Sequence, residues 1–291
     1  MSREVQLSSG RVEYDDVGAG PVVVLIHGAH MNASVWGRVV DDLGSDYRCV
    51  VPTLPLGAHR LPMASDADLT PMGIAALLGE LLDALDLNDV TLVGNDTGGA
   101  LAQMLVTSAP RRIARLVLAS CDAFDNFPPG LPGRVSALAG RMPGGMMMAA
   151  QAMRWGALAR LPLTWGWMAK RPVPRALLDS WFEPLRTERA VRRDAGRFMR
   201  AVDRHELMAA TEGLRSFDRP TLIAWASEDR VMPVDHAERL AELLRDARIV
   251  YVSDSYTLMP LDQPVQLAAR IREFIMSTPA EVQPDVGVGA A

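Results

Sequence analysis

The chain has 291 residues, a length that suits one α/β core with an insertion. Apolar residues make up 49% of it and charged residues 22%, which excludes bulk disorder. The net charge of −5 gives no general attraction to nucleic acid, and two cysteines are too few for a disulfide framework. The sequence shows neither a signal-like N-terminus nor an apolar run of about 20 residues. We therefore expect a cytoplasmic protein with no membrane and no nucleic-acid partner.

The chain opens with a predicted hairpin, Glu4–Leu7 and Arg11–Asp16, at the edge of a sheet. Apolar, β-branched runs then predict strands that are buried on both faces, as in a parallel sheet. They are Val22–Ile26, a run near Val50, Thr91–Val93, Leu116–Ala119, Thr221–Ala226 and Ile249–Val252. Helical patterns separate most of them, at Thr70–Leu85, Leu101–Val106, Asp235–Leu244 and Val265–Ile275. This alternation predicts an α/β fold with a mostly parallel sheet flanked by helices.

The alternation stops between residues 124 and 216, where no strand pattern is convincing. We interpret this stretch as a helical cap inserted into a core made of residues 1–123 and 217–276. From Phe124 to Arg215 there are 15 basic and 8 acidic residues, a balance of +7 that could attract an anionic substrate. Residues 277–291 have little packing capacity, so we expect a flexible tail.

The most informative stretch is Val90–Leu101 (VTLVGNDTGGAL), in which an apolar strand runs through a glycine-rich turn into a helix. The spacing Gly94-x-Asp96-x-Gly98 matches a nucleophile elbow with aspartate at its centre. Small residues are needed on both sides because the central backbone is strained and the chain doubles back tightly. The alternative is a simple turn in which Asp96 caps the helix. The buried strands that lead into His27-Gly28 and Asp229 favour the elbow.

With these motifs the chain resembles the α/β-hydrolase superfamily over residues 10–276. The motifs are His27-Gly28, the elbow, Asp229 with Pro233, and Asp262-Gln263-Pro264. The aspartate resembles the haloalkane dehalogenase and epoxide hydrolase branch, whose members form an alkyl–enzyme ester that activated water hydrolyses. The resemblance implies that Asp96 is the nucleophile and that the backbone N–H groups of Ala29 and Thr97 face the reacting oxygen or leaving group.

The chain departs from that branch in four respects. In the family a histidine stands five residues before the acid matched by Asp262, and here that position is Thr257. Threonine has no basic side chain, and activation of water by a base is typically worth 10²–10⁴-fold. Thr97 stands where dehalogenases place a tryptophan, and Ala29 where they often place an asparagine. The tyrosines that protonate epoxides have no counterpart in the predicted cap.

Several residues could replace the missing base. His30 lies in the predicted oxyanion loop, and His59 lies in a loop that borders the site in this fold. Asp229 could act directly as a base, or it could only pair with Arg230. The other histidines are expected to be structural (His27) or on helix surfaces (His205 and His236). Trp36 is a candidate for the pocket wall, although core packing would serve it equally well.

Three hypotheses stay open. In the first, a hydrolase acts on a small, largely apolar molecule through an Asp96 ester, with water activation impaired by Thr257. In the second, Asp96 is a general acid or base in an isomerisation, elimination or cyclisation. In the third, the protein only binds small molecules. Since the segment Gly94–Gly99 lacks a dinucleotide fingerprint and no metal-ligand cluster is present, we expect no cofactor and no metal. A homodimer is possible.

Overall fold

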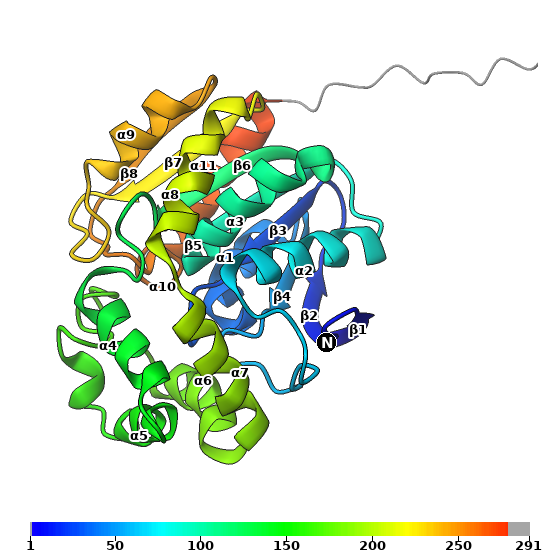
Figure 1. The fold of residues 1–291 in the computed structure, drawn as a ribbon. Coiled ribbons are helices and arrows are strands. Elements are labelled where there is room, and N and C mark those ends of the chain that lie inside the picture. Colours follow the sequence, from blue (N-terminus) through cyan, green and yellow to red (C-terminus); the bar gives the residue numbers. More distant parts are fainter. Residues whose placement is uncertain (1, 279–291) are drawn as a thin grey trace, which may run out of the picture.

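The computed structural model, described here for residues 2–278, is built around one eight-stranded sheet (Figure 1). The strand order is β1-β2-β4-β3-β5-β6-β7-β8. β1 and β2 form the predicted hairpin, β2 is also antiparallel to β4, and every other neighbouring pair is parallel. The strands are β1 (Ser2–Leu7), β2 (Gly10–Val17), β3 (Val22–Ile26), β4 (Arg48–Thr53), β5 (Val90–Asp96), β6 (Ile113–Cys121), β7 (Thr221–Ala226) and β8 (Ala247–Val252).

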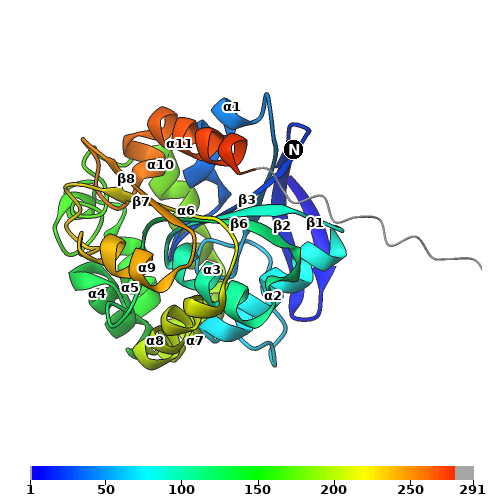
Figure 2. The same cartoon turned by 90° about the horizontal axis from the view of Figure 1, so that it is seen from above.

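Helices cover both faces of this sheet (Figure 2). α1 (Gly37–Leu43) and α11 (Pro264–Ser277) pack together on one face. α2 (Pro71–Ala84), α3 (Thr97–Ser108) and α9 (His236–Leu243) lie on the other. The central strands are largely apolar because both faces are covered, and all seven residues of β5 are buried, including its polar Thr91, Asn95 and Asp96. The α/β-hydrolase arrangement predicted from the sequence is confirmed.

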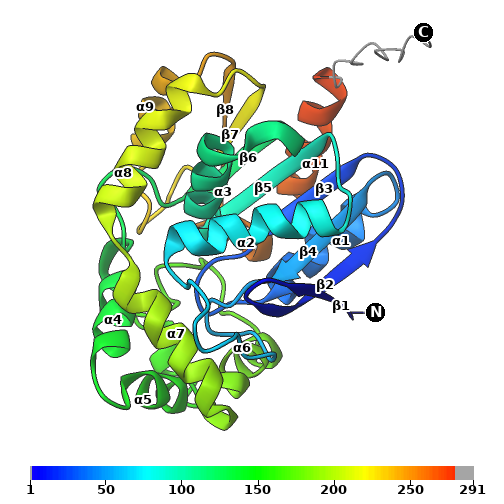
Figure 3. The ribbon, with the colours of Figure 1, turned by 45° about the vertical axis from the view of Figure 1, so that its right-hand side comes forward.

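The chain between β6 and β7 is helical and lies mostly beyond the carboxyl ends of the parallel strands (Figure 3). It contains α4 (Gly130–Arg141), α5 (Gly145–Ala152), α6 (Arg175–Thr187) and α7 (Arg189–Ala201), which we call the overlying helices. α8 (Arg204–Gly213) packs instead against α3. A short helix, α10 (Met259–Asp262), precedes α11. Most of the predicted tail, from residue 279 onward, lies outside the described residues.

Candidate active site

Asp96 ends β5 and stands at the sharp bend into α3. Its backbone has φ 55° and ψ −132°, a region that costs a non-glycine residue about 1–3 kcal/mol. The glycines around it have no room for a side chain. A Cβ on Gly94 would meet the carbonyl of Gly98, and one on Gly98 would meet the carbonyl of Ile26. The bend therefore requires this glycine pattern, and it turns Asp96 toward the space beneath the overlying helices.

The same geometry predicts that Gly99→Ala destabilises the protein strongly. A Cβ at Gly99 would overlap the side chain of Cys121, which is itself buried, so neither the backbone at Gly99 nor Cys121 has space to move away. We expect the free energy of unfolding, measured by urea titration, to fall by about 3 kcal/mol. Gly37→Ala is the matched control because nothing lies within 4 Å of its Cβ position, and it should change stability by less than about 1 kcal/mol. Equal effects of the two substitutions would contradict this account of the bend.

A cavity of about 240 Å³ lies between the bend and the overlying helices. Most of its wall is apolar and is made of alanine, glycine, proline, valine, leucine, methionine, phenylalanine and tryptophan. The exceptions among the described residues are His30, Asp96, Thr97, Ser136 and Thr164. Ala29 and His30 come from the loop after β3, and Asp96 and Thr97 come from the bend. The cavity therefore suits a small apolar molecule held against one carboxyl group.

Burial raises the pKa of Asp96 to about 7. The backbone N–H of Thr97 lowers this pKa, the charge of Asp229 raises it, and the N–H of Ala29 lowers it. Only 3% of Asp96 is exposed, and its Oδ1 has no hydrogen-bond partner in residues 2–278. The N–H groups of Thr97 and Ala29 thus stabilise the ionised carboxyl, at the place where an oxyanion site was expected from the sequence. Burial removes most other solvation of this charge, and the pKa is raised as a result.

Asp229 follows β7 and is held by Thr257. Its Oδ1 accepts hydrogen bonds from the N–H groups of Val231 and Met232, both at 2.9 Å, and from Thr257 Oγ1 at 2.7 Å. Its Oδ2 is buried without a partner in the described chain, and burial raises the pKa of this carboxyl too. Thr257 is fully buried and does not contribute to the cavity wall. A hydroxyl therefore occupies the place beside Asp229 where the family resemblance implies an imidazole.

Asn95 ties the strand ends to the loop that carries Thr257. Its Nδ2 donates to the carbonyl oxygens of Ala119 (2.7 Å), Ser120 (3.1 Å) and Thr257 (2.8 Å). The side chain is buried between β5, β6 and that loop. These bonds fix Thr257 relative to the bend that presents Asp96.

Asp122 is a third buried carboxyl that the sequence analysis missed. It follows β6 directly, its Oδ2 accepts a hydrogen bond of 3.1 Å from Thr97 Oγ1, and its Oδ1 is without a partner in the described residues. Burial and the charge of Asp96 raise its pKa well above the ordinary value. A usable signal was present, since polar residues just after parallel strands meet at one edge of the sheet.

His30 lines the cavity, as proposed from the sequence, but its ring has no hydrogen-bond partner within residues 2–278. Its backbone has φ 58°, and its ring stacks on Phe182 of α6 with centroids 6.2 Å apart. Burial lowers the pKa of this ring to about 4, so the imidazole is neutral at pH 7. It is the histidine that shares the cavity with Asp96.

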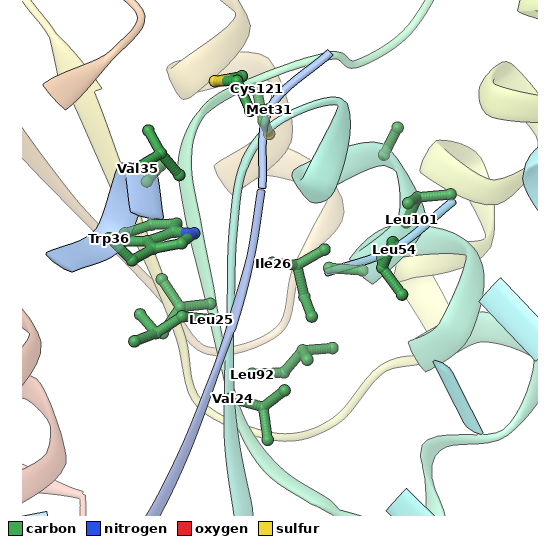
Figure 4. Packing of buried hydrophobic residues seen from close by; sticks show 14 of the residues in the cluster. Val24, Leu25, Ile26, Met31, Val35, Trp36, Leu54, Leu92, Leu101 and Cys121 are labelled. Atoms are coloured by element: carbon green, nitrogen blue, oxygen red, sulfur yellow. The ribbon is translucent and has the colours of Figure 1, made fainter. Parts of the chain in front are cut away.

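Two predicted pocket residues lie elsewhere. Trp36 is fully buried in the core cluster beneath the site and does not line the cavity (Figure 4). His59 reaches Asp194 of α7 instead, with Nε2 and Oδ2 3.5 Å apart, and Asp194 also accepts a bond from the N–H of Met63 at 2.9 Å. His59 thus joins a core loop to an overlying helix. Trp36 therefore packs in the apolar core, and the side chain of His59 is directed to the buried acid Asp194 on α7.

The remaining histidines are outside the cavity. His27 is structural, as expected: its Nδ1 lies 2.8 Å from the carbonyl of Gly28 and its Nε2 accepts from the N–H of Leu54. His205 is exposed on α8, also as expected. The placement of His236 on a helix surface was wrong, because its ring is buried against the edge of Phe124.

No helix within residues 2–278 is both long and apolar enough to cross a membrane. No group of three or more histidine, cysteine, aspartate or glutamate side chains there could hold a metal ion.

Known proteins are similar to this chain in sequence and fold. The chain is 28% identical to an uncharacterized protein of Mycobacterium tuberculosis, an alignment that covers 91% of this chain and 78% of that protein. It is 27% identical to 2-hydroxy-6-oxo-2,4-heptadienoate hydrolase of Pseudomonas putida, over 80% and 81% of the two chains. A shorter match, 31% identical over 39% of this chain and 36% of the relative, is to a haloalkane dehalogenase of Mesorhizobium japonicum.

Among solved structures, an α/β-hydrolase-fold protein from Burkholderia ambifaria superposes with a TM-score of 0.76 at 20% identity. That match covers 93% of this chain and 97% of the other. A thermophilic esterase from Thermogutta terrifontis superposes with a TM-score of 0.71 at 20% identity, over 95% and 98% of the two chains. The sequence model of the alpha/beta hydrolase family matches residues 23–270. The chain therefore belongs to the α/β-hydrolase family.

Proposed function

We propose that the protein is an enzyme that acts on a small, neutral, mostly apolar molecule through the carboxylate of Asp96. The observation that carries this proposal is the single carboxyl group, strained at φ 55°, that faces an apolar cavity of about 240 Å³. One carboxylate oxygen attacks a substrate carbon, the bond to the leaving group breaks, and its electron pair departs with that group. The product is an ester between Asp96 and the substrate.

The second half of the reaction is expected to be slow. Water must attack the carbonyl carbon of the ester, and a base normally removes its proton. Thr257 offers a hydroxyl that already donates to Asp229, and the ring of His30 has a pKa of only about 4. The ester should therefore accumulate, as expected for impaired water activation.

Mass spectrometry of the intact protein tests this function. After incubation with short haloalkanes, we expect a mass increase equal to the alkyl group less one hydrogen, and with epoxides an increase equal to the whole epoxide; peptide mapping should locate either one at Asp96. The rate of formation should rise as the pH increases through about 7, because only the ionised carboxyl attacks. Asp96→Asn is the control that should show no adduct. Neither adduct nor turnover, with ligand affinity unaffected by Asp96→Ala, would instead indicate a binding protein.

A second candidate, general acid–base catalysis by Asp96, is favoured by one observation. A pKa of about 7 is close to the pH at which proton transfer by a side chain is most effective. An isomerisation or elimination also needs no ester hydrolysis, so Thr257 would not hinder it. In this case the pH–rate profile should lose its acidic limb in Asp96→Asn, and no covalent adduct should be isolated.

A further inference from the structure

Exposed apolar side chains gather on the outer surface beside the cavity. On α4 and its end, Leu131, Val135, Leu138 and Met142 recur every three or four residues, so they share one face of the helix. They are 44%, 36%, 56% and 46% exposed. Val135 also lines the cavity, as do Leu161 and Leu163, which are 37% and 39% exposed. We call these six residues the apolar rim; three of them both line the cavity and are exposed at the surface.

The charge around the apolar rim has one sign. From Asn126 to Leu178 the sequence contains six arginines and one lysine but no aspartate or glutamate. Arg134 and Arg141 are seven residues apart on α4, beside the exposed stripe, and Arg160 directly precedes Leu161. All three are exposed, and in the described residues none forms an ion pair or a side-chain hydrogen bond. Unpaired cations next to exposed apolar side chains complement an anionic, partly apolar surface.

We infer that the apolar rim docks on the surface of an anionic lipid bilayer, so that apolar ligands pass from the bilayer into the cavity. Leucine, valine and methionine side chains would enter the boundary between headgroups and acyl chains, and Arg134, Arg141 and Arg160 would contact lipid phosphates. The overlying helices lie at one end of the molecule, away from the far ends of the strands (Figure 1). Docking through them leaves the sheet and its flanking helices in water.

A second copy of the chain fits the apolar rim less well. In a two-fold dimer the same surface meets itself, so these arginines would face arginines without an acid between them. The expectation of no membrane partner rested on the absence of a long apolar run. Apolar residues spaced three or four apart on α4, with Leu161 and Leu163 in a separate segment, produce no such run, so that criterion does not detect the apolar rim.

Co-sedimentation with lipid vesicles tests the inference. The purified full chain is mixed with vesicles of phosphatidylcholine alone, or of phosphatidylcholine and phosphatidylglycerol in equal parts. We expect binding to the mixed vesicles that weakens with added salt, and little binding to phosphatidylcholine alone. The double substitution Arg134→Glu and Arg141→Glu should reduce binding by about tenfold or more. Leu138→Asp should also reduce binding, since it removes an exposed apolar contact.

Matched controls separate docking from general effects. Arg245→Glu removes an exposed arginine that lies far along the chain and forms no ion pair with any described residue. Val265→Asp changes a side chain on α11 that is 61% exposed. Both should bind like the unaltered protein, and circular dichroism should show that all variants are folded. Asp96→Asn should also bind normally, because docking does not depend on the chemistry of Asp96.

Three results would overturn the inference. The first is no sedimentation with either vesicle. The second is equal binding to both vesicles that salt does not affect. The third is a concentration-dependent dimer, lost in Leu138→Asp, in a protein that does not bind vesicles, which would make the apolar rim a contact between copies.

Discussion

Replacing Asp96 with Asn is expected to stabilise the protein at pH 8 while it abolishes the reaction. Burial holds the pKa of Asp96 at about 7, whereas a carboxyl in the unfolded chain titrates near 3.8. Between these values the folded state binds a proton that the unfolded state has released, so stability falls as the pH rises. The loss above pH 7 amounts to up to about 4 kcal/mol, and an amide does not suffer it.

Thermal unfolding at a series of pH values measures this effect. At pH 8 the melting temperature of Asp96→Asn should exceed that of the unaltered protein by several degrees. At pH 3, where the carboxyl is mostly protonated in both states, the two proteins should melt at nearly the same temperature. Asp66→Asn changes an exposed aspartate that forms no ion pair in the part of the chain that the structure describes, and it should leave the dependence of melting temperature on pH unchanged. If Asp96→Asn were less stable than the unaltered protein at pH 8, burial of the ionised carboxyl would not be destabilising the folded state.

Thr257→His is expected to convert a single covalent reaction into repeated turnover. An imidazole at this position would take the place of the hydroxyl on Asp229, whose Oδ2 is buried without a partner in the described residues. The carboxylate would then orient the ring as a base for water. Activation of water by such a base is typically worth 10²–10⁴-fold, and the hydrolysis of a preformed Asp96 ester should accelerate by about that factor.

Single-turnover kinetics with a labelled alkyl group check this prediction. The rate of label release is compared for the unaltered protein, Thr257→His and Thr257→Val. Valine keeps the volume but removes the hydroxyl, so any gain with valine would come from packing alone. Since Thr257 is fully buried, the melting temperature of each variant is also needed. A folded Thr257→His that releases the label no faster would contradict the assigned role of this position.

Much of the fold could be predicted because its signals are local. Val22–Ile26 is a run of five apolar residues, and it forms β3 with the same ends. The glycine spacing predicted the bend at Asp96, since only glycine fits where the backbone of Gly98 passes the carbonyl of Ile26. The apolar run that forms β3 and the glycine spacing around Asp96 can each be recognised within a few consecutive residues of the sequence.

The site was harder to predict because it depends on side-chain direction and on distant partners. His59 and Trp36 lie in loops or short turns, where sequence periodicity does not fix which way a residue points. His59 faces Asp194, which is 135 residues away, and His236 faces Phe124. Asp122 sits at the same sheet edge as Asp96, but no family motif drew attention to it. Such contacts become visible only when the strands are placed side by side.

Asn95 has a consequence for how this chain could change its chemistry. Its three bonds hold the loop of Thr257 against the ends of β5 and β6 whatever side chain stands at position 257. All of them reach backbone carbonyls, so they survive substitution there. The residue at position 257 can therefore change without remodelling of the loop. This makes position 257 a site where substitution can give the fold a new catalytic role.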